Sequence, residues 1–324
     1  MAQDVLIFGP ETIQEVLVNA TRALGQAMEY HEARLQAELL LAHTLGVSRA
    51  MVLAKLDESI GRDVAAQYAA NVARRAKHEP LAYILGHQEF YGLDFLVDRR
   101  VLIPRHETEM LALLALQRMQ RVPHGSPVVV DVGTGSGALA LTLAHHLPNA
   151  EVLATEVSPD ALAVAEMNAK RLNLTGRVRL LLGDLLEPVQ TNFDILVANL
   201  PYIPSARFAE LADEIRRFEP RVALDGGLDG LSPMRSLLGQ LESHAASGGT
   251  AFLEISEEQG PAAVELAERQ IPHAEVILHH DLEGLARVVE IRLNNRPRVV
   301  DLRSSQVVTA FGLTDEDGLP AGCC

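Results

Sequence analysis

The feature that most restricts the fold of this 324-residue chain is a regular alternation of strand-like and helix-like segments between Pro127 and Leu293. The clearest helical segments are 138–146, the one that begins at Ser158, and 232–244. The expected strands are 128–132, 151–155, 178–182, 194–198, 250–255, 275–278 and 287–293. Because adjacent parallel strands need a crossover, which is usually a helix, this alternation predicts an α/β domain. Its sheet should be mostly parallel, with helices on both faces.

The part of the chain before this region has a different character. Residues 11–76 are rich in Ala, Leu, Glu and Arg, with apolar residues at helical spacing. Residues 89–101 predict a small hairpin, and 107–120 predict a further helix. We therefore expect a helical domain (1–87), a hairpin with a connecting helix (88–126), the α/β domain (127–293) and a poorly ordered tail (294–324).

Composition excludes several classes of protein. The formal net charge of −15 argues against nucleic acid as the main partner, although a local basic patch would be compatible with it. The cysteines are Cys323 and Cys324, whose adjacency suits neither a disulfide framework nor a zinc site. No apolar run reaches the ~18 residues of a membrane span, and the first residues lack a signal-peptide pattern. We expect a cytoplasmic protein without a metal site and without a membrane partner.

A glycine-rich loop, Asp131–Gly137, lies between the first strand of the α/β domain and its helix. Its alternating glycines, Gly133, Gly135 and Gly137, allow a tight turn and a close approach of a ligand to the backbone. The helix that follows presents free N–H groups. The loop alone is also compatible with a purely structural turn.

Acidic residues follow the next two strands. Glu156 comes just past the second strand, where a carboxylate can accept hydrogen bonds from ribose hydroxyls. Asp184 follows the third strand, where it could accept from an adenine amino group. Each by itself could be a solvated loop carboxylate. Together with the glycine loop and Asn199 they mark four successive strand ends, which favours a ligand that carries a nucleoside.

The loop chemistry narrows the choice of nucleoside. The spacing is G-x-G-x-G rather than the G-x-G-x-x-G of dinucleotide sites, and the phosphate-binding G-x-x-x-x-G-K-[ST] pattern is absent. No Lys or Arg lies in the loop to neutralise phosphates. These features suit S-adenosylmethionine, a nucleoside cofactor without phosphate. Its expected binding residues are Asp131, Gly133, Thr134, Gly135, Ser136, Gly137, Glu156, Asp184, Leu185 and Asn199.

The segment Asn199-Leu200-Pro201-Tyr202 follows the apolar strand 194–198. An Asn side chain offers an acceptor and two donors, so it can hold a planar amide or amino group by accepting from its N–H. The Pro stiffens the turn, and the Tyr supplies a face for stacking. An ordinary turn that closes the strand is the alternative interpretation.

These motifs resemble class I S-adenosylmethionine-dependent methyltransferases that modify planar nitrogens. Within that group the chain is similar to the release-factor glutamine N5-methyltransferases, the HemK/PrmC family, over residues 10–293. Further matching motifs are Pro80–Gly86, Glu89–Gly92, Leu102–Glu109, Phe218–Pro220, Ala223–Gly227, Gly284 and Arg287. The chain departs from the family at four positions. These are Leu200 for Pro, Glu156 for Asp, Leu185 for an aromatic residue, and His106 for Pro.

The resemblance implies a Rossmann-like methyltransferase domain with a mostly parallel seven-stranded sheet, a small N-terminal helical domain and a connecting β-hairpin. It implies that the substrate is the Gln of the Gly-Gly-Gln motif in class 1 peptide chain release factors. Residues 1–87 would then dock this protein substrate, or would act only as a stabilising cap.

The resemblance also implies roles in the site. Asn199 and Tyr202 would be catalytic, and Asn199, Leu200, Pro201 and Tyr202 would bind the substrate amide. The Asn199 oxygen would accept one amide N–H, the Leu200 carbonyl would accept the other, and Tyr202 would pack over the amide plane. No residue is a convincing general base, and Glu107 and Glu109 are candidates only through their position in the motif.

Three alternatives remain at this point. An adenine N6-methyltransferase acting on nucleic acid would share the holder at Asn199, and the net charge counts against it. A non-catalytic S-adenosylmethionine-binding module would bind the cofactor without turnover. The departures from the family at Leu185 and Leu200 are compatible with this alternative. A nicotinamide dehydrogenase is disfavoured by the glycine spacing.

Overall fold

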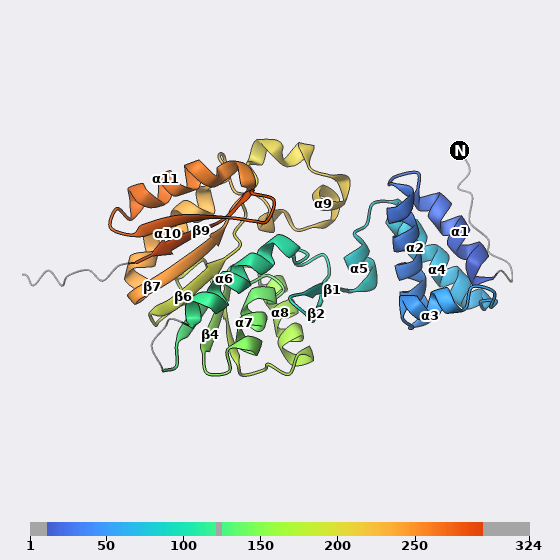
Figure 1. Cartoon of the computed structure of the whole chain (residues 1–324), viewed down its shortest axis with the longest axis horizontal. Coiled ribbons are helices and arrows are strands. Elements are labelled where there is room, and N and C mark those ends of the chain that lie inside the picture. Colours follow the sequence, from blue (N-terminus) through green and yellow to red (C-terminus); the bar gives the residue numbers. More distant parts are fainter. Residues whose placement is uncertain (1–11, 121–124, 294–324) are drawn as a thin grey trace, which may run out of the picture. The chain divides into compact units, whose positions relative to one another are not determined.

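The computed structural model describes residues 12–120 and 125–293. The described chain begins with helices and a hairpin and continues as an alternating α/β domain (Figure 1). The elements before the α/β domain are α1 (Ile13–Leu24), α2 (Tyr30–Leu45), α3 (Arg49–Ala54), α4 (Arg62–Ala76), α5 (Leu81–Leu85), β1 (His87–Phe90), β2 (Leu93–Leu96), η1 (His106–Thr108) and α6 (Glu109–Met119). Those after it begins are β3 (Val128–Val132), α7 (Ala138–His146), β4 (Glu151–Glu156), α8 (Pro159–Arg171), β5 (Val178–Leu182), β6 (Phe193–Ala198), η2 (Ser205–Glu210), α9 (Asp213–Phe218), η3 (Arg221–Ala223), α10 (Ser232–His244), β7 (Ala245–Glu254), η4 (Glu257–Gln259), α11 (Gly260–Gln270), β8 (Glu275–His280) and β9 (Ala286–Arg292).

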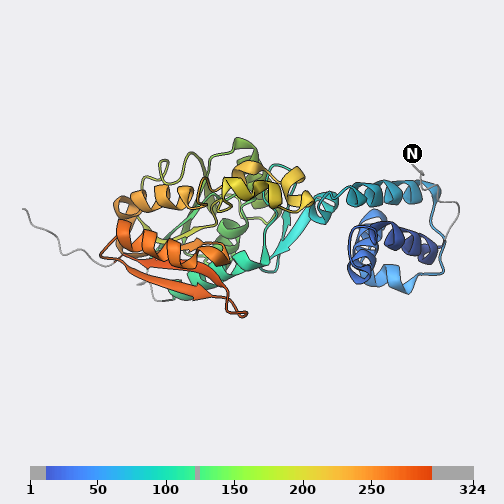
Figure 2. The ribbon, with the colours of Figure 1, turned by 90° about the horizontal axis from the view of Figure 1, so that it is seen from above.

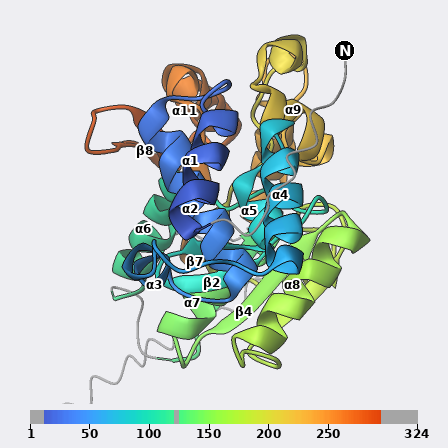
Figure 3. The ribbon, with the colours of Figure 1, turned by 90° about the vertical axis from the view of Figure 1, so that its right-hand side faces the viewer.

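The N-terminal helices enclose a hydrophobic cluster of their own. Helix α1 begins with a capping box, in which the Thr12 hydroxyl accepts from the Glu15 N–H and the Glu15 carboxylate accepts from the Thr12 N–H. Helices α1, α2 and α4 lie side by side (Figure 3). Buried Leu17, Leu40 and Tyr68 are part of the cluster that they share. The prediction of a helical N-terminal segment is confirmed.

The α/β domain contains a seven-stranded sheet with the order β5-β4-β3-β6-β7-β9-β8. The pairs from β5 to β7 are parallel, whereas β9 is antiparallel to both β7 and β8. In Figure 2 the hairpin of β8 and β9 lies at one margin of this domain. The predicted mostly parallel seven-stranded sheet is confirmed.

The two faces of the sheet pack against different helices, because successive side chains of a strand point to opposite faces. Val129 and Val197 belong to the hydrophobic cluster that includes residues of α6, α7 and α8. Their neighbours Val130 and Leu196 belong to the cluster that includes residues of α10 and α11. Both faces are therefore buried, which explains the continuous apolar runs of the central strands.

The predicted segment boundaries compare with the elements as follows. The hairpin of β1 and β2 and the helix α6 lie where they were expected. The boundary proposed at residue 87 falls on the first residue of β1, so the division of the chain into domains stays a proposal. The poorly ordered tail that was expected at 294–324 lies outside the described residues.

Asn168 of α8 joins three parts of the fold. Its side chain is fully buried. Its Oδ1 accepts from the Leu96 N–H at 2.7 Å, and its Nδ2 donates to the carbonyls of Leu96 and Ser136 at 3.0 and 2.8 Å. One amide thus ties the hairpin strand β2 and the glycine-rich loop to helix α8.

We predict that Asn168→Ala lowers the free energy of unfolding by about 2–4 kcal/mol, because it removes the side-chain partner of one buried and two partly buried backbone groups. The measurement is urea denaturation of both proteins. Lys170→Ala, which removes an exposed ion pair with Glu166 on the same helix, is the control and should cost no more than about 0.5 kcal/mol. Equal stability of the two variants would show that the Asn168 bonds contribute little.

Candidate active site

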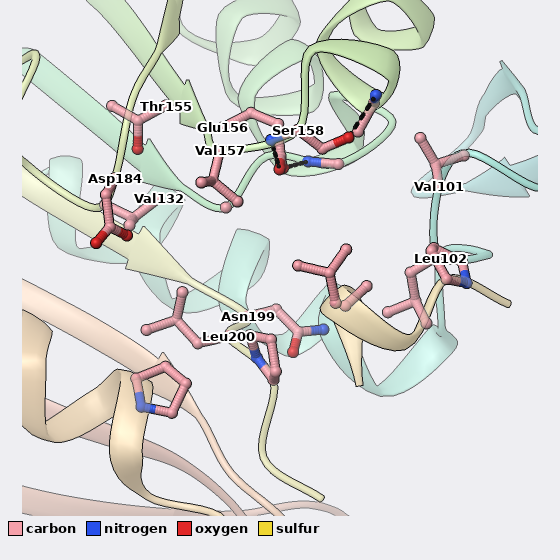
Figure 4. A pocket seen from close by; sticks show the side chains of 18 of the residues that line it. Val101, Leu102, Val132, Thr155, Glu156, Val157, Ser158, Asp184, Asn199 and Leu200 are labelled. Atoms are coloured by element: carbon pink, nitrogen blue, oxygen red, sulfur yellow. Dashed lines mark hydrogen bonds between the residues drawn. The ribbon is translucent and has the colours of Figure 1, made fainter. Parts of the chain in front are cut away.

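The site lies at the point where the connections of the sheet diverge. From β3 the chain continues to β4 and β5 on one side and then returns to β6 on the other. In an open α/β sheet such a switch point leaves a crevice outside the carboxyl ends of the strands. The loops after β3, β4, β5 and β6 meet there around one pocket (Figure 4). Its lining includes the predicted residues Gly133, Gly135, Glu156, Asp184, Leu185, Asn199, Leu200 and Pro201.

The glycine-rich loop takes a backbone conformation that side chains would strain. Gly133 has φ +75°, and a Cβ there would lie 3.3 Å from the Leu200 side chain. Gly137 has φ +84°, and a Cβ there would lie 2.9 Å from Leu141. Glycine therefore lets the loop turn tightly between β3 and α7 and leaves backbone exposed to the pocket.

Glu156, the last residue of β4, holds the edge of the pocket. Its carboxylate accepts from the N–H of Gly135 and from the N–H of Ser158, both at 2.9 Å (Figure 4). The Ser158 hydroxyl in turn caps helix α8 by accepting from the Ala161 N–H. The carboxylate has further lone pairs, so it can also accept from hydroxyl groups of a ligand.

Asp131 lies beneath the loop rather than in the wall of the pocket. Its side chain is buried, and its Oδ2 accepts from the Thr134 hydroxyl at 2.6 Å and the Ala140 N–H at 3.1 Å. Its Oδ1 has no partner among the described residues. Burial raises the pKa of this carboxyl to about 7. Like Asp131, the predicted residues Thr134, Ser136 and Gly137 are not among the residues that line the pocket, so their support of a ligand would be indirect.

The wall beyond β4 and β5 combines one carboxylate with apolar surface. Asp184 and Leu185 follow β5, and Leu185 takes a positive φ of 47°. Val157, which follows Glu156, is 54% exposed and lines the same pocket. A carboxylate beside flat apolar surface suits an aromatic ring with an amino group.

The sequence analysis did not assign several residues of this pocket to the site, although Leu102, Pro220, Ala223 and Asp225 lie in motifs that it named. The unassigned residues are Arg100, Val101, Leu102, Val132, Thr155, Val157, Ser158, Ala161, Gly183, Pro220, Val222, Ala223, Asp225 and Pro233. Val157 and Gly183 could have been assigned to the pocket from the sequence, because they are the neighbours of Glu156 and Asp184. The guanidinium of Arg100 pairs with Asp98 at 2.6 Å, so this cation is already neutralised.

The segment from Asn199 to Tyr202 lies directly after β6. The Asn199 Nδ2 donates to the Thr108 hydroxyl at 2.9 Å. Leu200 is buried, and its peptide bond to Pro201 is trans. Burial raises the pKa of the Tyr202 hydroxyl. The main-chain carbonyl of Tyr202 accepts a hydrogen bond from the Gln259 side chain at 3.0 Å. The segment is thus held at both ends.

A second, smaller cavity adjoins this segment. Its lining residues are Leu102, Arg105, Asn199, Tyr202, Ile203, Ile215, Ala223 and Leu224. Arg105 forms a salt bridge with the buried carboxylate of Glu219. Asn199 borders both cavities, so it can contact a ligand in either one.

Neither acidic residue considered as a general base lines these two cavities. The Glu109 carboxylate accepts from the Tyr91 N–H at 3.0 Å and so anchors the hairpin. Within residues 12–120 and 125–293, no group of three or more His, Cys, Asp or Glu side chains could hold a metal ion. No helix in the same ranges is long and apolar enough to cross a membrane.

Two family models match the chain. Residues 15–86 match the model of the PrmC N-terminal domain, and residues 104–228 match that of ribosomal protein L11 methyltransferase (PrmA).

Curated relatives cover most of the chain. It is 45% identical over 252 residues to the release factor glutamine methyltransferase of Moorella thermoacetica. The aligned region covers 78% of this chain and 88% of that relative. The chain is 44% identical over 245 residues to the release factor glutamine methyltransferase of Geobacter sulfurreducens, with coverage of 75% and 84%. Among solved structures, a release factor-specific protein-(glutamine-N5) methyltransferase from Alicyclobacillus acidocaldarius is 27% identical, with a TM-score of 0.37, over 59% of this chain and 94% of that one.

We predict that Asp131→Asn gains stability relative to the wild type as the pH rises from 5 to 8. The pKa of Asp131 is raised in the folded protein. Its contribution to stability is therefore fully present below the pKa that it has in the unfolded chain, and is lost as the pH rises through about 7. The neutral amide does not titrate, and the difference should grow by about 2 kcal/mol over this range.

The measurement is urea denaturation of the two proteins at several pH values. A difference in stability that stays constant from pH 5 to pH 8 would mean that Asp131 is not protonated near neutral pH.

Proposed function

Because this chain belongs to the family of release factor glutamine methyltransferases, we propose that it methylates the side-chain nitrogen of the Gln in the Gly-Gly-Gln motif of class 1 peptide chain release factors. Membership makes it an S-adenosylmethionine-dependent methyltransferase. The single observation that best supports this substrate is the position of Asn199. It borders both the pocket of the glycine-rich loop and the smaller cavity beside Tyr202.

The larger pocket fits S-adenosylmethionine. Gly133 and Gly135 leave backbone open to it, and Glu156 and Asp184 provide acceptors for ribose hydroxyls and for the adenine amino group. The apolar wall at Leu185 would cover the adenine. No unpaired cation that would call for a phosphate was found among the described residues of the lining. When bound, S-adenosylmethionine supplies a methyl group on a positively charged sulfur.

The smaller cavity suits the glutamine side chain. The Asn199 Nδ2 donates to Thr108, and the Asn199 Oδ1, for which the described residues provide no donor, is available to accept one N–H of the substrate amide. The Leu200 carbonyl accepts the other, and Tyr202 packs over the amide plane. An amide nitrogen is a poor nucleophile because its lone pair is delocalised, and two acceptors fix it in position and favour its pyramidalisation. After transfer, the nitrogen loses a proton to water.

Other parts of the proposal concern partners and location. We propose that the helices within residues 1–87 dock the release factor, which is supported by the match of residues 15–86 to the PrmC N-terminal domain. We propose a cytoplasmic location, where release factors act. Nucleic acid is not expected as a direct partner, because the net charge is −15.

The proposal is tested by incubating the protein with a class 1 release factor and S-adenosylmethionine, followed by mass spectrometry. We expect a mass increase of one methyl group on the motif glutamine and none on a release factor in which that glutamine is replaced by alanine. Methylation of adenine in an oligonucleotide would support the alternative activity on nucleic acid. Cofactor binding without any product would support a non-catalytic module.

We predict that Asn199→Ala reduces kcat at least a hundredfold while the affinity for the cofactor changes little. Loss of a buried hydrogen-bonding partner costs about 1–3 kcal/mol, and misplacement of the reacting nitrogen adds to it. Turnover and calorimetry on one preparation measure both quantities. Asp184→Ala is the matched control and should weaken cofactor binding. Normal turnover of Asn199→Ala would refute the proposed holder.

We predict that Leu200→Pro keeps or raises turnover. No hydrogen bond donated by the Leu200 N–H is found within the described ranges, so Pro loses no donor there, and it keeps the carbonyl. Because the Leu200 side chain is buried, stability should fall by about 1 kcal/mol. Steady-state rates and thermal unfolding check these expectations. A large loss of activity in a folded variant would mean that the Leu200 side chain contacts a ligand.

A further inference from the structure

Glu254 is a buried carboxylate next to the proposed amide holder. Strands β6 and β7 are parallel neighbours, and their register pairs Ala198 with Leu253. The next residues along the two strands are Asn199 and Glu254, which therefore lie at the same edge of the sheet. Glu254 is 7% exposed, and none of the roles proposed above uses it.

Thr108 contacts Asn199 and lies near Glu254. It is buried at the junction of η1 and α6, and its Oγ1 accepts from the Asn199 Nδ2. A hydroxyl that accepts one hydrogen bond still has a proton to donate. Burial raises the pKa of the Glu254 carboxyl, and the nearby Thr108 hydroxyl partly offsets this rise. The Glu254 Oε2 has no hydrogen-bond partner among the described residues. The carboxylate is thus the available acceptor for the Thr108 proton.

Among the described residues, no cation forms a salt bridge with Glu254. Arg287 pairs with Asp281 at 2.7 Å, and Arg105 pairs with Glu219. The side chain that acts on the Glu254 carboxyl by hydrogen bonding is Thr108.

We propose that Glu254, acting through Thr108, is a positioning residue that sets which end of the Asn199 side chain faces the substrate. This inference rests on the proposed function. An ionised Glu254 can only accept, so the Thr108 hydroxyl donates to it and presents its lone pair to Asn199. The Asn199 amide then points its nitrogen at Thr108 and leaves its oxygen to accept the N–H of the substrate glutamine.

Protonation of Glu254 reverses this chain of hydrogen bonds. A protonated carboxyl can donate to Thr108, whose hydroxyl is then free to donate to the Asn199 oxygen. The Asn199 amide would turn its NH₂ group toward the substrate amide, where two donors face each other. The unprotonated Glu254 is therefore the form that supports methyl transfer.

The charges around Glu254 determine where this change occurs. Burial and, to a smaller extent, Glu107 raise its pKa, whereas the Thr108 hydroxyl, Arg287 and Arg105 lower it, and the resulting pKa is about 7. Burial, together with the charge of Glu254, raises the pKa of the Tyr202 hydroxyl, so this side chain stays neutral over the same range. Activity should consequently be present above pH 7 and be lost as the pH falls below it.

The first test compares Thr108→Val, which removes the hydroxyl at nearly constant shape, with Thr108→Ser, which keeps it. The assay measures methylation of a release factor, with kcat, KM and cofactor affinity determined separately. We expect Thr108→Val to lower kcat about a hundredfold with little change in KM or cofactor affinity, because the reacting amide is misoriented. Thr108→Ser should restore most of the activity.

The second test is the pH profile of kcat for the wild type and Glu254→Gln. The wild type should lose activity through about pH 7, and Glu254→Gln should be at least about tenfold slower and lack this acid limb. Asp131 also titrates near pH 7, and it remains in both proteins. An acid limb that persists in Glu254→Gln assigns it to another group and overturns the proposal.

The remaining outcomes are equally decisive. Full activity of Thr108→Val overturns the proposal, as does a loss of kcat that is matched by a loss of cofactor affinity, since that pattern indicates a structural role. If Thr108→Val does not fold, the pH profile of Glu254→Gln decides. A wild type that binds S-adenosylmethionine and does not methylate any release factor overturns the proposed function itself.

Discussion

The alignment of parallel strands at one edge of the sheet is the constraint on which this site depends. In the register of β3 with β4 and β6, Asp131 pairs with Ala154 on one side and Val197 on the other. The three strands consequently end at the same level. The glycine-rich loop, Glu156 and Asn199 follow these ends and need no long excursion to meet. Parallel pairing thus turns residues far apart in the sequence into neighbours.

This alignment also explains how much could be predicted from the sequence. Each strand end carries a residue with recognisable chemistry, and a parallel sheet places all of these at one edge, so Glu156, Asp184 and Asn199 could be assigned to one pocket. The insertion of β9 between β7 and β8 could not be predicted, because periodicity reports burial and not strand order. Helices α9 and α11 were not predicted either.

Supporting residues were harder to find than contacting ones. Thr108 is 91 positions before Asn199. It lies in the motif Leu102–Glu109, but nothing in that motif marks it as the partner of the Asn199 side chain. Asp131 was expected to line the pocket, yet it holds the loop from below through Thr134. Such contacts depend on tertiary packing between distant segments. A single sequence contains no signal for them, whereas motifs at strand ends are local.

The hydrogen-bond partners of a buried carboxylate indicate whether it stabilises the fold or supports the chemistry of the site. Glu219 is buried, and it has both the guanidinium of Arg105 and the N–H of Ile103 as partners, as expected for a group that joins two segments. Asp131 and Glu254 are equally buried, but each keeps an oxygen without a partner among the described residues. A buried carboxylate oxygen without a partner costs stability, so packing alone does not account for either residue. Asp131 is the last residue but one of β3, and Glu254 ends β7. At such positions near the pocket a fold tolerates this cost when the group orients a ligand or a catalytic side chain.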